Sequence, residues 1–242
     1  MIYELHGKIP QNSSFIYSED VLTSTIFGNL RYLKSPLLLN DFLSKAKNSA
    51  SDNFSFEFSG NLKISFWKKF TQKSTFQINE PDLVLEDENQ VLIIECKYHS
   101  PLDENYSPDY NQYMNQLLRY SSILDEYYPN KKNRNIIFLT LKDYDIEEIF
   151  EKTEKKLSKD IGLFWLRWEE LFSCLNKYLE NVSDDGEKTL IMDLKNFLIK
   201  RQLKFFSGIT IPRDSYSWKY KKNKKYSFSS KFESYAWRYN HE

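Results

Sequence analysis

The sequence predicts an α/β protein in which a central mixed β-sheet is flanked by helices. Runs of apolar residues alternate with polar ones between residues 54 and 97, as in half-buried strands. Apolar residues at helical spacing precede and follow this region. After residue 97 the order helix, strand, helix, strand favours parallel additions, so the sheet should be mixed.

At 242 residues the chain is long enough to bury one substantial core. We expect one domain over residues 1–212 and a basic, aromatic extension over 213–242. The extension holds eight Lys or Arg against three Asp or Glu, a net charge of +5, which leaves −5 for the rest of this neutral chain. This asymmetry permits an anionic partner without requiring one.

Cysteine and histidine usage excludes several classes of protein. The two cysteines, Cys96 and Cys174, fall in a predicted strand and a predicted helix, so no disulfide scaffold is expected. The three histidines show no paired spacing that would indicate structural zinc. No signal segment and no bilayer-length apolar run is present, so we expect a cytoplasmic protein without a membrane partner.

The first predicted helix runs from Ser18, a good N-cap, to about residue 33. Glu19 shares a stripe with the apolar Leu22 and Ile26, which should face the core. An inward carboxylate needs a partner. The alternative is that Glu19 and the neighbouring Asp20 only complement the helix dipole.

A second helix is expected over residues 37–48. Alternating Phe54, Phe56 and Phe58, a turn at 59–61, and a second alternating run to residue 66 predict a hairpin. Residues 75–79 are expected to add another extended piece.

Residues 82–87 and 91–97 are two apolar-rich runs joined by a polar turn, the pattern of a β-hairpin. With Glu88-Asn89 as the turn, facing residues have numbers that sum to 177, which places Asp82 opposite Glu95. Two carboxylates about 5 Å apart repel by ~3 kcal/mol at an effective dielectric near 20. A divalent cation such as Mg²⁺ or Mn²⁺ between them would replace this repulsion with coordination.

Strand alternation places Glu95 and Lys97 on one face, with Ile94 and Cys96 pointing into the core. Two acids and a lysine beside a metal ion suit phosphodiester hydrolysis. The ion activates water and polarises the phosphate, and the ammonium stabilises the developing charge.

Pro81-Asp82 followed across the hairpin by Glu95-Cys96-Lys97 resembles the PD-(D/E)XK nuclease superfamily. The resemblance covers about residues 18–141 and implies a restriction-endonuclease-like three-layer fold. It implies that Asp82, Glu95 and the main-chain carbonyl of Cys96 hold Mg²⁺ or Mn²⁺, and that Glu19 completes the metal shell. Lys97 would position the attacking water or stabilise the phosphate.

A helix is predicted over residues 108–128, with Gln112, Gln116 and Tyr120 on one stripe. Gln116-Leu-Leu-Arg-Tyr120 resembles the QxxxY motif of the RecB-like branch of the superfamily. That resemblance implies that both side chains lie near the active site on its substrate side. The alternative is a polar stripe in water.

Two further residues are weaker substrate-binding candidates. Arg119 is a candidate phosphate contact, against the alternative of a solvated arginine. His99 lies in a predicted polar loop over residues 98–107 beside the site and could contact substrate, although a lone loop histidine is more often solvated.

The C-terminal half is predicted as a strand at 135–141, a helix at 145–157, a strand at 162–167, and helices reaching residues 180 and 204. In the tail, aromatic and basic residues alternate around a turn near 222–224. Its rings either stack bases, as in single-strand binders, or dock on the domain. We favour docking, and either arrangement lets the lysines touch DNA.

These observations predict a Mg²⁺-dependent deoxyribonuclease, and the resemblance implies a setting in restriction, phage defence or repair. A homo-oligomer or a protein partner is compatible with this hypothesis. Asp82→Ala or Lys97→Ala is expected to abolish cleavage without unfolding the protein. The alternatives are a non-catalytic nucleic-acid-binding or assembly module with the same fold, and a hairpin whose acids merely pair with Lys97 in solvent.

Overall fold

The computed structural model describes most of the chain between residues 18 and 203. The described ranges are 18–55, 57–58, 61–73, 76–98, 100–102, 104–107, 112–141 and 146–203. The predictions for His99, for Phe56 and for the extension over residues 213–242 lie outside these ranges.

A five-stranded mixed sheet forms the centre of the fold, with the strand order β1-β4-β5-β8-β9. β1, β4 and β5 are antiparallel neighbours, whereas β8 and β9 add in parallel. The mixed sheet expected from the order of elements is therefore confirmed. The strands are β1 (Lys63–Phe66), β4 (Leu83–Glu86), β5 (Gln90–Cys96), β8 (Asn133–Thr140) and β9 (Ile161–Arg167).

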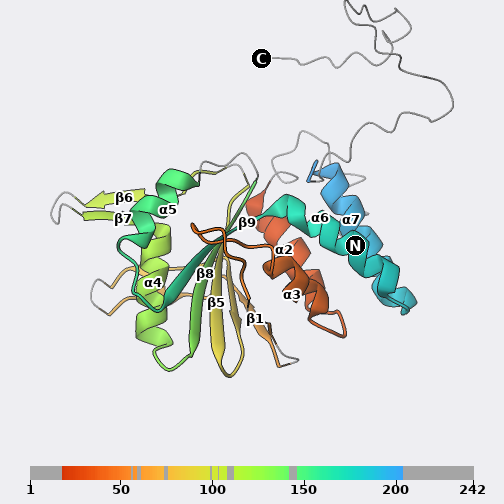
Figure 1. The fold of residues 1–242 in the computed structure, drawn as a ribbon, viewed down its shortest axis with the longest axis horizontal. Coiled ribbons are helices and arrows are strands. Elements are labelled where there is room, and N and C mark those ends of the chain that lie inside the picture. The colour runs from red at the N-terminus through yellow and green to blue at the C-terminus, as the bar shows by residue number, and fades with distance from the viewer. Residues whose placement is uncertain are drawn as a thin grey trace, which may run out of the picture. The chain divides into compact units, whose positions relative to one another are not determined.

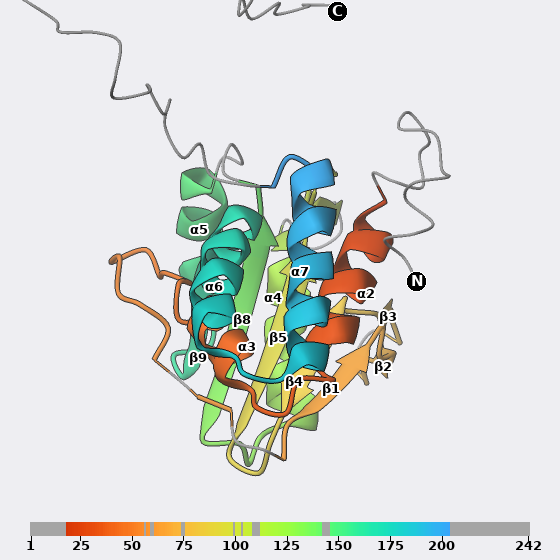
Figure 2. The same ribbon diagram turned by 90° about the vertical axis from the view of Figure 1, so that its right-hand side faces the viewer.

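Helices cover both faces of this sheet, which gives three layers (Figure 1). One face carries α4 (Gln116–Tyr127) and α5 (Glu147–Glu154). The other face carries α2 (Glu19–Leu30), α3 (Leu37–Leu43), α6 (Trp168–Asn181) and α7 (Asp185–Lys200), and this layer faces the viewer in Figure 2. Each face has its own apolar core, so every residue of β5 is buried.

The central hairpin has the register expected from its sequence. Leu83 lies opposite Ile94 and Glu86 opposite Val91, so the paired numbers sum to 177. The Asp87 carboxylate accepts hydrogen bonds from the backbone amides of Asn89 and Gln90, at 2.9 and 3.0 Å, and so fixes the tight turn. Asp82 and Glu95 come one residue beyond the pair Leu83 and Ile94, at the end of the β4–β5 ladder.

The predicted alternation of an apolar face and an open chemical face is only partly correct. Val91 and Ile93 share the face of Glu95, yet both are fully buried beneath α4. Because helices cover both sides of the sheet, polar chemistry is confined to the carboxyl end of β5.

Two predictions before the hairpin are wrong. The helix expected over 37–48 ends at Leu43, because the chain then turns to run along the edge of β9. The described residues at 54–58 form no strand of a hairpin with β1. Instead, the Asn40 side chain exchanges two 3.0 Å hydrogen bonds with the backbone of Phe58 and replaces a strand partner.

The long helix predicted over residues 108–128 begins only at Gln116. Before it, β7 (Gln112–Asn115) pairs with β6 (Glu104–Ser107), so the 98–107 region is not simply a loop. The Asn115 side chain caps the helix by accepting a 2.9 Å hydrogen bond from the Leu118 amide. Gln112 is therefore on a strand and does not share a helical stripe with Gln116.

The later elements follow the sequence prediction closely, within a few residues at each end. The extended piece expected at 75–79 contains β3 (Ile78–Asn79), which pairs with β2 (Phe70–Thr71). Among the described residues, no helix is both long enough and apolar enough to cross a membrane.

Candidate functional site

The candidate site lies at the carboxyl end of β5, where four segments meet. The start of α2 contributes Glu19, the residue before β4 contributes Asp82, and β5 and its end contribute Glu95 and Lys97. The start of α4 contributes the pair Gln116 and Tyr120. Side chains that are 101 positions apart in the sequence are thus connected at one end of the sheet.

Glu95 and Lys97 form the buried centre of the site. The Lys97 ammonium lies 2.7 Å from Glu95 Oε1, and their side chains are only 10% and 2% exposed, respectively. Alternation along the strand puts them on one face, as predicted. They are a desolvated ion pair rather than a solvated surface one, which excludes the interpretation of the hairpin as a solvent-facing structural pair.

Glu19 has the partners that an inward carboxylate requires. Its Oε2 accepts hydrogen bonds of 2.7 Å from the Tyr98 amide and from the Ser100 hydroxyl, and its Oε1 lies 3.7 Å from Lys97 Nζ. The neighbouring Asp20 is exposed. Glu19 therefore does more than complement the helix dipole, because it clamps the segment that follows β5.

Asp82 is tied to the backbone of the same strand. Its Oδ2 accepts a 2.8 Å hydrogen bond from the Cys96 amide. Burial, together with the negative charge of Glu95, raises the pKa of Asp82 to about 8. The carboxyl group thus holds a proton near neutral pH unless positive charge compensates it.

The two residues of the QxxxY pattern join this cluster. Tyr120 donates a 2.5 Å hydrogen bond to Glu95 Oε2, and Gln116 Nε2 donates one of 2.7 Å to the Tyr120 hydroxyl. Tyr120 is 1% exposed, so this helix face is not a polar stripe in water. Lys97 contacts Oε1 of Glu95, and the Gln116–Tyr120 pair holds the other carboxylate oxygen, Oε2.

The protonation equilibria reflect strong burial and close charges. Burial raises the pKa of Glu95 against the opposing effects of Lys97 and Tyr120. The pKa of Lys97 is also raised, because the Glu95 charge and its hydrogen bond outweigh burial. Burial raises the pKa of the Cys96 thiol well above its usual range, so this thiol is not a nucleophile.

Arg119 does not behave as the sequence suggested. The residue is 6% exposed, which rules out the solvated arginine and leaves little surface for a phosphate contact. The residues of α4 that reach the cluster are instead Gln116 and Tyr120, which are bonded toward Glu95.

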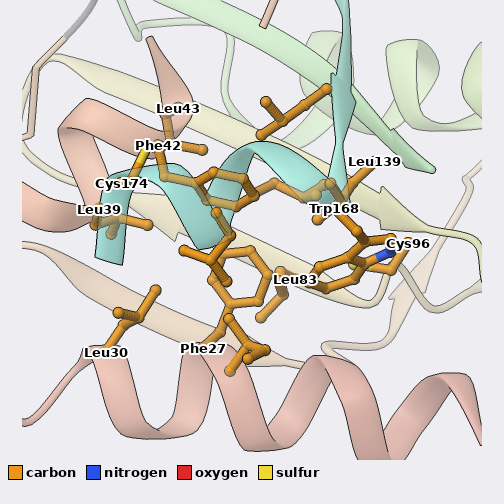
Figure 3. Packing of buried hydrophobic residues seen from close by; sticks show 14 of the residues in the cluster. Phe27, Leu30, Leu39, Phe42, Leu43, Leu83, Cys96, Leu139, Trp168 and Cys174 are labelled. Atoms are coloured by element: carbon orange, nitrogen blue, oxygen red, sulfur yellow. The ribbon is translucent and has the colours of Figure 1, made fainter. Parts of the chain in front are cut away.

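Two residues that sequence reasoning missed support the site. Trp168, at the start of α6, donates its indole N–H to the Lys97 carbonyl at 3.2 Å. Figure 3 shows its fully buried ring between Phe27 of α2 and Cys96 of β5. The second is Ser100, which donates to Glu19. No motif marks either residue, because their contacts arise from packing across the chain.

Comparison of the chain with protein-family models, with curated proteins and with solved structures gave no match. Its chemistry must therefore be argued from the geometry of the site.

The donor set fits a magnesium ion in a limited way. Among the described residues, no group of three or more His, Cys, Asp or Glu side chains is arranged to hold a metal ion. The negative charge of Glu95 nevertheless disfavours the ionised form of Asp82, that of Glu19 disfavours the ionised form of Glu95, and one ammonium opposes three carboxylates. Mg²⁺ in proteins is commonly held by one or two carboxylates and keeps several waters, so two acids suffice.

Tyr120→Phe is expected to lower the free energy of unfolding by about 1–3 kcal/mol. The substitution removes the donor to the buried Glu95 carboxylate and leaves Gln116 without its acceptor. Urea denaturation at pH 7 measures this. Tyr127→Phe is the matched control. The Tyr127 side chain is 41% exposed, and its hydroxyl donates a hydrogen bond to the Thr71 carbonyl. Equal losses in the two variants would contradict a special role for the Tyr120 contact.

Proposed function

We propose that this protein is a metal-dependent nuclease with a restriction-endonuclease-like fold. The single observation that carries the proposal is the convergence of Asp82, Glu95 and Lys97 at the end of one strand, with the Gln116–Tyr120 pair bonded to Glu95. The same residues carry the resemblance to the PD-(D/E)XK superfamily and its RecB-like branch. A desolvated cluster of acids with one lysine is costly for folding and typical of a functional site.

The order of elements supports the same proposal. A helix (α2), three antiparallel strands of the main sheet (β1, β4 and β5), a helix (α4) and a parallel strand (β8) occur in this order through the region of resemblance, with α3 and the two-stranded pairs β2–β3 and β6–β7 inserted between them. This order resembles the α-β-β-β-α-β core of the superfamily. In this chain Asp82 directly precedes β4 and Glu95 lies in β5.

In the proposed reaction, Asp82 and Glu95 would hold the Mg²⁺ or Mn²⁺ ion. When bound, the ion supplies Lewis-acid polarisation of the phosphate and a more acidic water. Lys97 lies against Glu95 with a raised pKa, so it remains an ammonium at neutral pH and can stabilise negative charge on the phosphate. Glu19 and Trp168 hold the Lys97 segment, and Tyr120 orients the Glu95 carboxylate.

The test is cleavage of labelled single-stranded DNA, duplex DNA and RNA in the presence of Mg²⁺ or Mn²⁺. We expect at least one of these polymers to be cut, and Asp82→Asn to lower the rate by about a thousandfold or more, because a metal-holding carboxylate is lost. Asp20→Asn is the matched control, since it removes the same charge from an exposed position next to Glu19. No cleavage of any of the three by the wild-type protein, or cleavage that survives Asp82→Asn, would overturn the proposal.

The second candidate is a non-catalytic module that binds nucleic acid. It is favoured by one observation, that the Lys97 ammonium and the Tyr120 hydroxyl between them contact both oxygens of Glu95. Calorimetric titration with Mn²⁺ separates the two candidates. Heat of binding that disappears in Asp82→Asn supports the nuclease, whereas absence of binding by the wild-type protein supports the module.

A further inference from the structure

A polar cavity, here called the edge cavity, lies along the outer edge of the sheet, beside β9. Its volume is about 610 Å³, and the side chains that matter for its chemistry are Lys45, Lys47, Phe54, Trp165, Arg167 and Glu170. None of them belongs to the candidate site described above. The cavity combines aromatic rings with cations.

Charge separates this cavity from two others in the described part of the protein. It is lined by three cations and one carboxylate. A cavity beside α3 and α6 has three carboxylates and one lysine, and one at the central hairpin turn has three carboxylates. The edge cavity is therefore the one of the three suited to an anionic ligand.

The cations differ in how far they are neutralised. Arg167 pairs with Glu170, and Lys45 lies 3.6 Å from Asp41. Lys47 is exposed and forms no ion pair with any residue that the structure describes. Its charge is available to a ligand, and an additional anion would also be attracted by the two partly neutralised cations.

The cavity is built from fixed parts. Lys47 and Trp165 exchange backbone hydrogen bonds of 2.9 and 2.7 Å, which attaches the lysine segment to the edge of β9. The Trp165 indole N–H donates to the Thr140 hydroxyl at 2.7 Å, and its ring lies 5.9 Å from the Arg167 guanidinium carbon. An indole held in this way needs no reordering to accept a flat ligand.

The register of the sheet relates this cavity to the candidate active site. Glu95 pairs with Phe138 on β8, and Phe138 pairs with Trp165 on β9, so the three residues form one row across the sheet. Parallel neighbours in a row point to the same face. Two strand spacings separate Glu95 from Trp165, which is about 10 Å. At a rise of 3.4 Å per nucleotide, this equals about three nucleotide steps of a duplex strand.

We propose that the edge cavity binds the backbone of the nucleic-acid strand engaged at the active site, a few nucleotides from the scissile phosphate. Lys47 and Lys45 contact phosphates, and Trp165 provides a face against which a base or sugar packs. This inference rests on the proposed function, because the ligand is the substrate of that same site. It adds a direction: the strand leaves the active site past the carboxyl end of β8 toward β9, because Phe138 within the row is buried.

The experiment measures binding without cleavage. Fluorescence anisotropy of a labelled oligonucleotide, single-stranded or duplex, is recorded in EDTA with the full chain. The double variant Lys45→Glu/Lys47→Glu is compared with Lys132→Glu/Lys159→Glu. The control lysines are exposed and precede β8 and β9, at the opposite end of these strands, and the change in net charge is identical.

We expect the cavity variant to raise Kd at least tenfold and the control variant to change it less than threefold. The slope of log K against log salt should fall by about 1.5 to 2 in the cavity variant alone, as for the loss of two phosphate contacts. Equal weakening by both variants would show that only net charge matters and would overturn the proposal. Unchanged binding by the cavity variant, or no binding by the wild-type protein, would overturn it as well.

These outcomes are distinct from failure of the nuclease proposal. If the cavity variant alone loses binding while no metal supports cleavage, the edge cavity stands and the enzymatic proposal fails. If Asp82→Asn abolishes cleavage while the two double variants bind alike, the enzyme stands and the edge cavity fails.

Discussion

Lys97→Met is expected to lower the free energy of unfolding by about 3 kcal/mol at pH 7. The substitution leaves the Glu95 carboxylate buried without its ammonium partner, and breaking a buried ion pair typically costs 3–5 kcal/mol. Protonation of Glu95, whose pKa is already raised, should reduce this loss. Urea denaturation of the metal-free protein at pH 5 and pH 7 measures the effect, which should be smaller at pH 5.

A double-mutant cycle with Glu95→Gln isolates the pair. Glu95→Gln/Lys97→Met should be more stable than Lys97→Met alone, because no uncompensated charge is then buried. Lys132→Met is the control, since that lysine is exposed. Loss of less than about 1 kcal/mol in Lys97→Met would show that the ion pair is solvated, in the range of surface pairs.

This result would revise one expectation drawn from the sequence. Removal of Lys97 was expected to abolish cleavage and spare the fold, as for a side chain at an open catalytic face. Its burial implies that loss of activity in Lys97→Ala would be confounded by loss of stability. Asp82→Asn is the better test of catalysis, because an amide oxygen can still accept the Cys96 hydrogen bond.

Asp82→Asn is expected to stabilise the metal-free protein by about 5 kcal/mol at pH 8. The pKa of Asp82 is raised to about 8 in the folded state, against about 4 in the unfolded chain. Between these values the folded state binds the proton that the unfolded state has released. The free energy of unfolding of the wild-type protein therefore falls as the pH rises from about 4 to 8.

Asparagine does not titrate in this range. The difference in the free energy of unfolding between Asp82→Asn and the wild-type protein should therefore grow with pH and vanish near pH 4. Differential scanning calorimetry in EDTA should show a melting temperature roughly 10–20 °C higher than wild type at pH 8. Added Mn²⁺ should stabilise the wild-type protein and not the variant. A variant less stable than wild type at pH 8 would instead indicate that Asp82 acts as a structural acceptor for the Cys96 amide.

The fold was predictable wherever local pattern and burial agree. The central hairpin was expected with the correct register, because its short turn leaves one pairing and alternation resists a slip by one residue. The start of the helix expected from residue 108 was wrong over residues 112–115. These residues form β7, which pairs with β6, and α4 begins only after the Asn115 cap, because pairing with a distant strand outweighs local helix propensity.

The sequence by itself determined which residues could perform chemistry: the spacing of Asp82, Glu95 and Lys97 follows from the hairpin register, and Gln116 and Tyr120 share a face because they are four apart on a helix. Only the tertiary structure decided what surrounds them. Packing of helices on both faces of the sheet buries Glu95 and Lys97, brings Trp168 to the Lys97 carbonyl, and places Lys47 against Trp165. Local spacing fixes which way a side chain points, whereas burial and long-range contacts depend on elements that are distant in the chain.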